Sequence, residues 1–296
     1  MKFTHPINLL FSSLIAIGLA SCGSSSSDKD KNSSEFKEAE ESLKEQIEDV
    51  IYNIPPPSEI PYLLQATGAE FNESLVNPRT KVDQYASRTD KAALNLGVYA
   101  ADIGYLSSYD KTQEAIDYLN STKTLADNLG IIGSFDVEIL QKFEANISNK
   151  DSLTRLLDRT IKKAENYLAD DNRNKLSALV VTGSFVEGLY IATGLIKSYP
   201  KDLLPDDARN LVLTPLIRVV LDQKKSASDL LKMLSGVEQT EPIATIVTDL
   251  KSLEGAYNAL NIEEQIKNNK ANLVLTDKNL IDITTIVEKM RKIITE

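Results

Sequence analysis

The chain of 296 residues has no tryptophan, a single cysteine and a single histidine. Cys22 and His5 both lie within the first 22 positions, so every later residue belongs to a stretch without thiol or imidazole. This absence excludes intrachain disulfides, zinc sites built from Cys and His, Ser-His-Asp and Cys-His catalysis, and His-ligated haem. An active site there would need carboxylates, Lys, Tyr, Ser or Thr. We predict neither a cofactor nor a metal site.

The segment before Cys22 has the three parts of a secretory signal. A positive charge at Lys2 precedes an apolar run from Leu9 to Leu19, and small residues follow that run. The run is too short to span a bilayer as a helix, which takes about 20 apolar residues. We therefore predict an export signal over residues 1–21.

The four residues Leu19-Ala20-Ser21-Cys22 resemble the lipobox of bacterial lipoproteins. In that family the signal peptidase cuts before the cysteine, and the cysteine thiol carries diacylglycerol. The resemblance implies a mature chain that begins at a triacylated Cys22 and has the membrane as a partner through this lipid. The segment from Asn95 to Gly130 is similar to stretches in uncharacterised outer-membrane lipoproteins, a resemblance that implies no activity.

Residues 22–35 are predicted to form the lipidated cysteine and a flexible tether. They are almost wholly Gly, Ser, Asp, Lys and Asn, a composition with no apolar surface to bury. Gly23 follows the cysteine, whereas Asp at that position retains enterobacterial lipoproteins in the inner membrane. The resemblance thus implies an outer-membrane location, with the domain facing the periplasm or the cell surface.

The chain is acidic, with 43 Asp and Glu against 33 Lys and Arg, a formal net charge of −10. Removing residues 1–21 removes one charge, that of Lys2, and brings the total to −11. An acidic domain repels nucleic acid and anionic headgroups. We therefore predict no nucleic-acid partner.

From residue 36 to residue 296 the apolar residues recur at helical spacing. The last such stripe comprises Leu280, Ile283, Val287, Met290 and Ile294. No segment alternates apolar and polar residues between turn pairs. The pattern predicts an all-α fold: one multi-helix domain of antiparallel helices, arranged as a bundle or a slightly superhelical array of helical hairpins.

Turn-forming residues predict several helix boundaries. A short helix is expected from Ser58 to Thr67, and Asn77-Pro78 should interrupt the chain. Asp110 is predicted to be the N-cap of the helix that Gly130 ends.

Two segments, Ala92–Leu106 and Leu176–Ile196, are apolar on nearly every face of their predicted helices. Their few polar residues include Asn95 and Asp102 on one stripe of the first, and Glu187 in the second. Five of the chain's 12 glycines lie in these segments: Gly97, Gly104, Gly183, Gly188 and Gly194. Each glycine costs about 1 kcal/mol relative to Ala inside a helix, so close helix packing is expected to offset them.

A third isolated charge, Arg218, lies in the apolar run Leu211–Leu221. We expect Asp102, Glu187 and Arg218 to converge, with Asn95 on the same stripe as Asp102. One interpretation is a core network of ion pairs and hydrogen bonds that fixes helix register. The other is a pocket whose carboxylates bind a polar ligand or act as acid and base.

These observations predict a tethered domain that binds envelope proteins or a small ligand and performs no catalysis. The alternative is a carboxylate-based hydrolase that acts on envelope or extracellular glycans. The two differ in geometry, because a hydrolase needs Asp102 or Glu187 to open onto a cleft. A binding or assembly domain can bury both.

Overall fold

The computed structural model describes residues 54, 56, 58–131, 142, 152, 155, 156, 159, 174–199, 205–260 and 278–296. All of them belong to one unit of the chain, Glu41–Glu296. The lipobox and the tether lie outside these residues. Within the described part the regular structure is helical throughout, without a strand, which confirms the all-α prediction.

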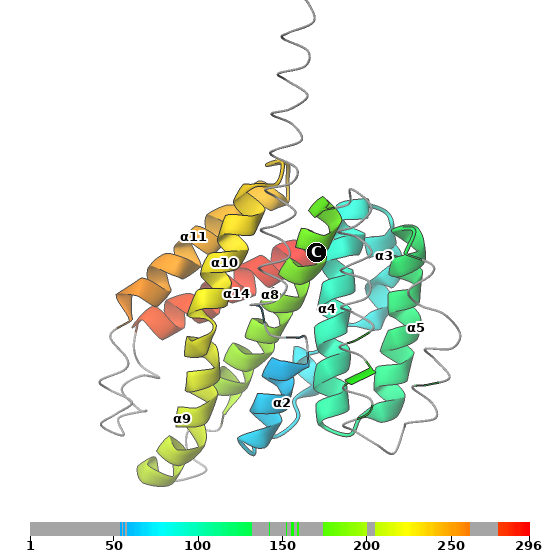
Figure 1. Cartoon of the computed structure of the whole chain (residues 1–296). Coiled ribbons are helices and arrows are strands. Elements are labelled where there is room, and N and C mark those ends of the chain that lie inside the picture. Colours follow the sequence, from blue (N-terminus) through cyan, green and yellow to red (C-terminus); the bar gives the residue numbers. More distant parts are fainter. Residues whose placement is uncertain are drawn as a thin grey trace, which may run out of the picture. The chain divides into compact units, whose positions relative to one another are not determined.

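The described elements, in chain order, are α2 (Glu59–Ala66), η1 (Glu73–Leu75), η2 (Arg79–Lys81), α3 (Val82–Ala86), α4 (Thr89–Ser108), α5 (Thr112–Asn128), α8 (Asn174–Ser198), α9 (Asp206–Asp222), α10 (Lys224–Ser235), α11 (Ile243–Ala259) and α14 (Lys278–Thr295). Helix α2 matches the short helix predicted between Ser58 and Thr67. Helices α4 and α8 lie side by side in the middle of this unit (Figure 1). Helices α3 and α5 pack on the side of α4, and α10, α11 and α14 lie on the side of α8 (Figure 1).

Glycines bring the backbones of α4 and α8 into direct contact. An alanine Cβ at Gly97 would lie 2.0 Å from the carbonyl oxygen of Val180, and one at Gly183 would lie 1.8 Å from that of Leu94. Only a residue without Cβ allows this approach. Gly97 and Gly183 thus confirm the expectation that close helix packing offsets the cost of glycine in these helices. Two others, Gly188 and Gly194, instead accommodate the side chains of Ile60 and Leu75.

Helices α4 and α5 each end at a residue in the left-handed region of backbone space. Asp110 has φ 60°, and the N–H of Lys111 bonds back to the Leu106 carbonyl at 2.9 Å. Gly130 has φ 73° and ends α5 as predicted. The prediction that Asp110 caps the start of α5 is wrong. This residue instead closes α4 in the manner of a Schellman motif, and Lys111 occupies the N-cap of α5.

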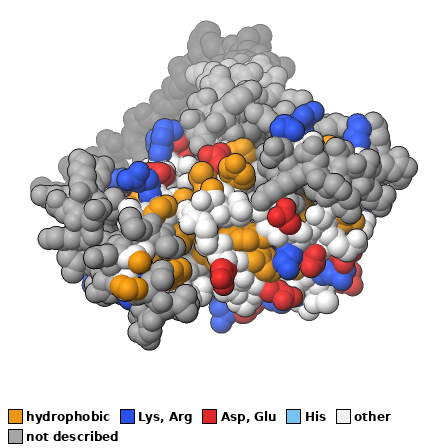
Figure 2. Space-filling view, turned by 90° about the horizontal axis from the view of Figure 1, so that it is seen from below, with side chains coloured by type: hydrophobic (Ala, Val, Ile, Leu, Met, Phe, Trp, Pro, Cys, Tyr) orange, Lys and Arg blue, Asp and Glu red, His pale blue; other side chains and the backbone are white. Residues whose placement is uncertain are grey.

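Among the described helices, only α8 is long and apolar enough to cross a membrane, judged by length and composition alone. Of its most apolar window, 94% is buried inside the protein, and a core helix meets the same criteria. Large hydrophobic side chains that are exposed in the described part include Tyr62, Leu63 and Ile281. In the view from below, hydrophobic side chains share the described surface with acidic and basic ones (Figure 2).

Candidate functional site

A buried ion pair joins α8 to α14 at the centre of the unit. Arg291 donates from Nε to Glu187 Oε2 and from Nη2 to Oε1, both at 3.0 Å. Glu187 is 0% exposed, and the Arg291 side chain is 16% exposed. The guanidinium also stacks over the ring of Tyr190, 4.2 Å from its centroid. This two-point geometry is the strongest form of a carboxylate–guanidinium contact.

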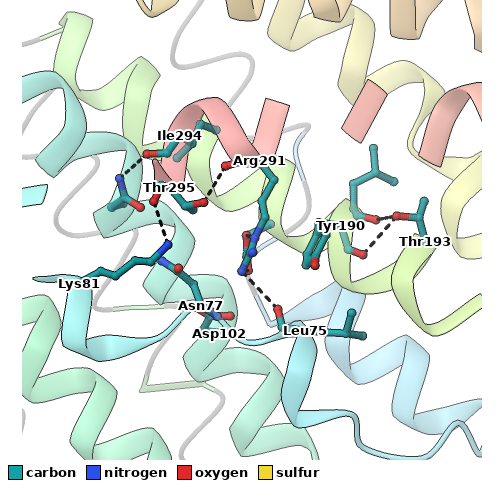
Figure 3. Close-up of polar contacts among 12 residues, drawn as sticks. Leu75, Asn77, Lys81, Asp102, Tyr190, Thr193, Arg291, Ile294 and Thr295 are labelled. Carbon is teal, nitrogen blue, oxygen red and sulfur yellow. Dashed lines mark hydrogen bonds and ion pairs between the residues drawn. The ribbon is translucent and has the colours of Figure 1, made fainter. Parts of the chain in front are cut away.

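Asp102, on α4, lies beside this ion pair (Figure 3). It is also 0% exposed, and its carboxyl is within hydrogen-bonding reach of the Glu187 carboxylate. The backbone N–H of Asn77 donates to Asp102 Oδ2 at 3.3 Å, whereas Oδ1 accepts no hydrogen bond. Two fully buried carboxyl groups therefore share one site with a mostly buried guanidinium.

Burial shifts the protonation of both acids in the same direction. It raises the pKa of Asp102 well above its usual range, and the negative charge of Glu187 raises it further. Burial also raises the pKa of Glu187, but the charge of Arg291 and its hydrogen bonds oppose that shift. At Arg291 burial alone would lower the pKa, yet the Glu187 carboxylate raises it above the usual value.

The loop at Asn77 and Pro78 is held by side chains from three neighbouring helices. The Tyr118 hydroxyl donates to the Asn77 carbonyl at 2.8 Å, and the Tyr99 hydroxyl donates to the Pro78 carbonyl at 3.1 Å. The Tyr85 hydroxyl lies 3.2 Å from Asn77 Oδ1 and shares its single proton between this oxygen and the Thr295 carbonyl. Asn77 is fully buried. These bonds satisfy backbone groups that would otherwise be costly to bury in a loop.

The last carbonyls of α14 are bound by side chains from earlier elements (Figure 3). Asn95 Nδ2 donates to the Ile294 carbonyl at 2.9 Å. The Thr295 carbonyl accepts from Lys81 Nζ at 3.2 Å and from the Tyr85 hydroxyl at 3.1 Å. A cation at this end also complements the negative pole of the helix dipole. Helix α14 is thereby joined to η2, α3 and α4.

Of the four residues predicted to form the polar cluster, Asp102 and Glu187 come together as expected. Asn95 is buried on the same helix as Asp102, but its amide binds the end of α14 and the backbone carbonyl of Lys91. Arg218 does not join the cluster. It lies with Pro215 and Asp222 on the exposed face of α9, opposite the buried residues of that helix. Arg291 supplies the cation that we expected from Arg218.

The buried position of Arg291 is indicated by the sequence, although Arg291 is not an isolated charge in an apolar run. It follows Val287 by four residues and precedes Ile294 by three, so it continues the apolar stripe of α14. A cation at a position that the period assigns to the buried side predicts a buried acidic partner. Arg291 is hard to recognise in the sequence because other charged residues surround it on α14. Arg218 is easy to recognise because its neighbours in the sequence are apolar.

A cluster of aromatic rings also lies around Phe71. Its ring stacks on Tyr105 at 5.1 Å between centroids and approaches Tyr109 at 5.7 Å, with Lys111 Nζ 5.2 Å above it. The Tyr105 hydroxyl accepts a hydrogen bond from the backbone N–H of Asn72 at 2.8 Å. Burial raises the pKa of Tyr105 to about 12. The buried ring of Tyr105 with its bonded hydroxyl fits core packing.

The arrangement of Asp102, Glu187 and Arg291 keeps charged side chains in the interior and joins helices α4, α8 and α14. Its carboxyl groups are enclosed, so they have no surface at which a substrate would meet them. Among the described residues no group of three or more His, Cys, Asp or Glu is placed to hold a metal ion. Comparison of the chain with protein-family models, with curated proteins and with solved structures found no match.

Proposed function

We propose that this chain is a lipid-anchored outer-membrane lipoprotein whose helical domain works by binding, either to other envelope proteins or to a small ligand. The observation that carries the proposal is Leu19-Ala20-Ser21-Cys22, placed directly after a short apolar run with a positive start. The Gly- and Ser-rich stretch that follows suits a tether between a lipid and a folded domain.

The burial of the two central acids supports binding over hydrolysis. A carboxylate-based glycosidase needs two carboxyl groups that reach the scissile bond, one as acid and one as base or nucleophile. Asp102 and Glu187 are both enclosed, and Glu187 is bound at both oxygens by Arg291. Hydrolysis of envelope or extracellular glycans remains the alternative function. No contact of these two side chains favours it.

Metabolic labelling with an alkyne analogue of palmitate tests the anchor. We expect the wild-type chain to carry the label and to sediment with outer membranes, and a Cys22→Ser variant to do neither. Ser21→Ala is the matched control, because it keeps a small residue before the cysteine and should label like the wild type. Equal labelling of the Cys22→Ser and wild-type chains would refute lipidation at this cysteine.

Affinity purification from native membranes tests the binding role. Proteins that co-purify with the wild-type chain but not with Cys22→Ser would support an envelope assembly role for the anchored form, and a co-purified small molecule would support a ligand. Release of sugars from envelope glycans by the purified chain, lost in Glu187→Gln, would overturn the binding proposal in favour of the hydrolase.

A further inference from the structure

We propose that Asp102 and Glu187 hold one proton between them, carried by Asp102, and that this proton forms a pH-sensitive lock joining α4, α8 and α14. The lock consists of Asp102, Glu187 and Arg291. It is independent of the lipid anchor and of whatever the domain binds.

The first argument is the balance of charge. Arg291 donates from Nε and Nη2 to Glu187, and its guanidinium also donates from Nη2 to the Leu75 carbonyl at 3.5 Å. No second cation of the described residues bonds either carboxyl. If both acids were ionised, one negative charge would be buried without a cation, which costs several kcal/mol. One bound proton removes that charge.

The second argument is the position of the proton. Asp102 Oδ2 accepts from Asn77 N–H, and Oδ1 lacks any donor. A proton on Oδ1 leaves the hydrogen bond from Asn77 to Oδ2 in place and makes the Asp102 carboxyl a donor toward the Glu187 carboxylate, whose charge Arg291 stabilises. The same proton on Glu187 would weaken both hydrogen bonds from Arg291. The geometry therefore assigns the proton to Asp102 and the charge to Glu187.

The neighbouring titratable groups do not interfere near neutral pH. Those that face Asp102 from other positions are the phenols of Tyr85 on α3, Tyr99 on α4 and Tyr118 on α5. Burial raises the pKa of Tyr85 to about 12 and raises those of Tyr99 and Tyr118 further. All three stay neutral while the carboxyl pair titrates.

The direction of the pH effect follows from linkage. The pKa of Asp102 is raised in the folded state above its ordinary value of 3.8, so between these two pKa values the folded chain binds one proton more than the unfolded chain. Unfolding then releases this proton to water. The contribution to stability is complete below the unfolded pKa and is lost as the pH rises through the folded pKa.

Asp102→Asn is the decisive variant, because its neutral amide matches the protonated acid in shape. Its Nδ2 can donate to Glu187 while its Oδ1 accepts from Asn77. We would measure urea unfolding of the full-length chains in a non-ionic detergent from about pH 4 to about pH 9. The ratio of the wild-type to the variant unfolding constant should rise about tenfold per pH unit above the unfolded pKa, then level off.

Using the ratio removes the titration of the remaining acids, which both chains share. A ratio that is constant over this range, or one that falls with rising pH, would overturn the proposal. Glu187→Gln is the mirror variant. It leaves the charge of Arg291 without its carboxylate, so it should lower stability at every pH instead of reproducing the Asp102→Asn profile.

Infrared spectroscopy of the wild-type chain tests the lock without any substitution. At about pH 6, where an ordinary Asp or Glu is ionised, the folded chain should show the C=O stretching band of a protonated carboxylic acid. Unfolding at the same pH should abolish the band. Absence of the band from the folded chain would overturn the proposal even if Asp102→Asn failed to fold.

Discussion

Two regions of the protein hold their helices together in different ways. The central pair, α4 and α8, meets backbone to backbone at Gly97 and Gly183. The outer set, α10, α11 and α14, meets through side chains that include Ser228 with Glu254, and Lys289 with Asp249 at 2.6 Å. A backbone contact cannot adjust its spacing, whereas long side chains can change rotamer. Tolerance to substitution should therefore differ sharply between the two regions.

The difference extends to the polar groups that each region contains. The central pair encloses Asp102 and Glu187 completely, so a lost partner leaves a group without water. In the outer set, Lys289 is exposed at the surface even though its partner Asp249 is mostly buried. Loss of one polar group should therefore lower the stability of the protein strongly in the central pair and weakly in the outer set.

The largest effect should come from removing the cation that α14 contributes to the buried carboxyl groups of the central pair. Arg291→Met keeps an apolar stem of similar length but leaves Glu187 buried without its partner, which is expected to lower the free energy of unfolding by about 3–5 kcal/mol. Urea denaturation followed by circular dichroism measures this change. The control is Lys292→Met on the same helix, whose ion pair with Glu296 is exposed. Similar losses in both variants would contradict the central role of Arg291.

Glycine substitutions test the spacing of the central pair directly. Gly183→Ala and Gly97→Ala place a methyl group against the backbone of the facing helix, and each should cost about 3 kcal/mol, at the upper end of the range for overpacking. Gly255→Ala on α11 is the matched control. Nothing lies within 4 Å of its added Cβ, so it should stabilise the protein by about 1 kcal/mol.

The sign of the difference between these alanines is the informative result, and thermal denaturation can report it. If Gly97→Ala and Gly183→Ala proved as stabilising as Gly255→Ala, the contact between α4 and α8 would not be closed to a methyl group. The comparison between the two regions would then fail.

The smallest effect is expected at a surface contact between the regions. Lys197, on α8, pairs with Glu288 on α14 at 2.5 Å, and both side chains are well exposed. Lys197→Ala should lower stability by at most about 1 kcal/mol, because exposed ion pairs contribute little. The difference should shrink further at about 1 M salt, where the screening length is about 3 Å. A loss that is large and insensitive to salt would contradict this.

Much of the fold could be predicted from composition and period. The apolar segments around Asn95 and Glu187 contained glycines whose cost required close packing, and the structure places Gly97 and Gly183 in that contact. The amphipathic stripe of the last helix was equally predictable from the sequence, because its period repeats over several turns. The cap at Asp110 was not, since Asp favours both the start of a helix and the left-handed turn that ends one.

The candidate site was predictable only in part. Asp102 and Glu187 stood out because they interrupt apolar helices, and burial of an acid requires a partner. Which cation supplies that partner depends on how distant helices cross, and helical period alone does not fix this. Arg218 and Arg291 both lie near apolar runs. Only the packing of α14 against α8 decides between them.

The hydrogen bonds that fasten the end of α14 also bear on when the chain folds. Tyr85 and the Thr295 carbonyl are 210 positions apart, and Asn95 and the Ile294 carbonyl are 199 apart. Contacts of such long range make folding slow, because a large loop must close before they form. During synthesis the centre must wait for α14, the last described helix to leave the ribosome. For a chain that is exported as proposed, this slow closure lengthens the time during which the polypeptide is unfolded.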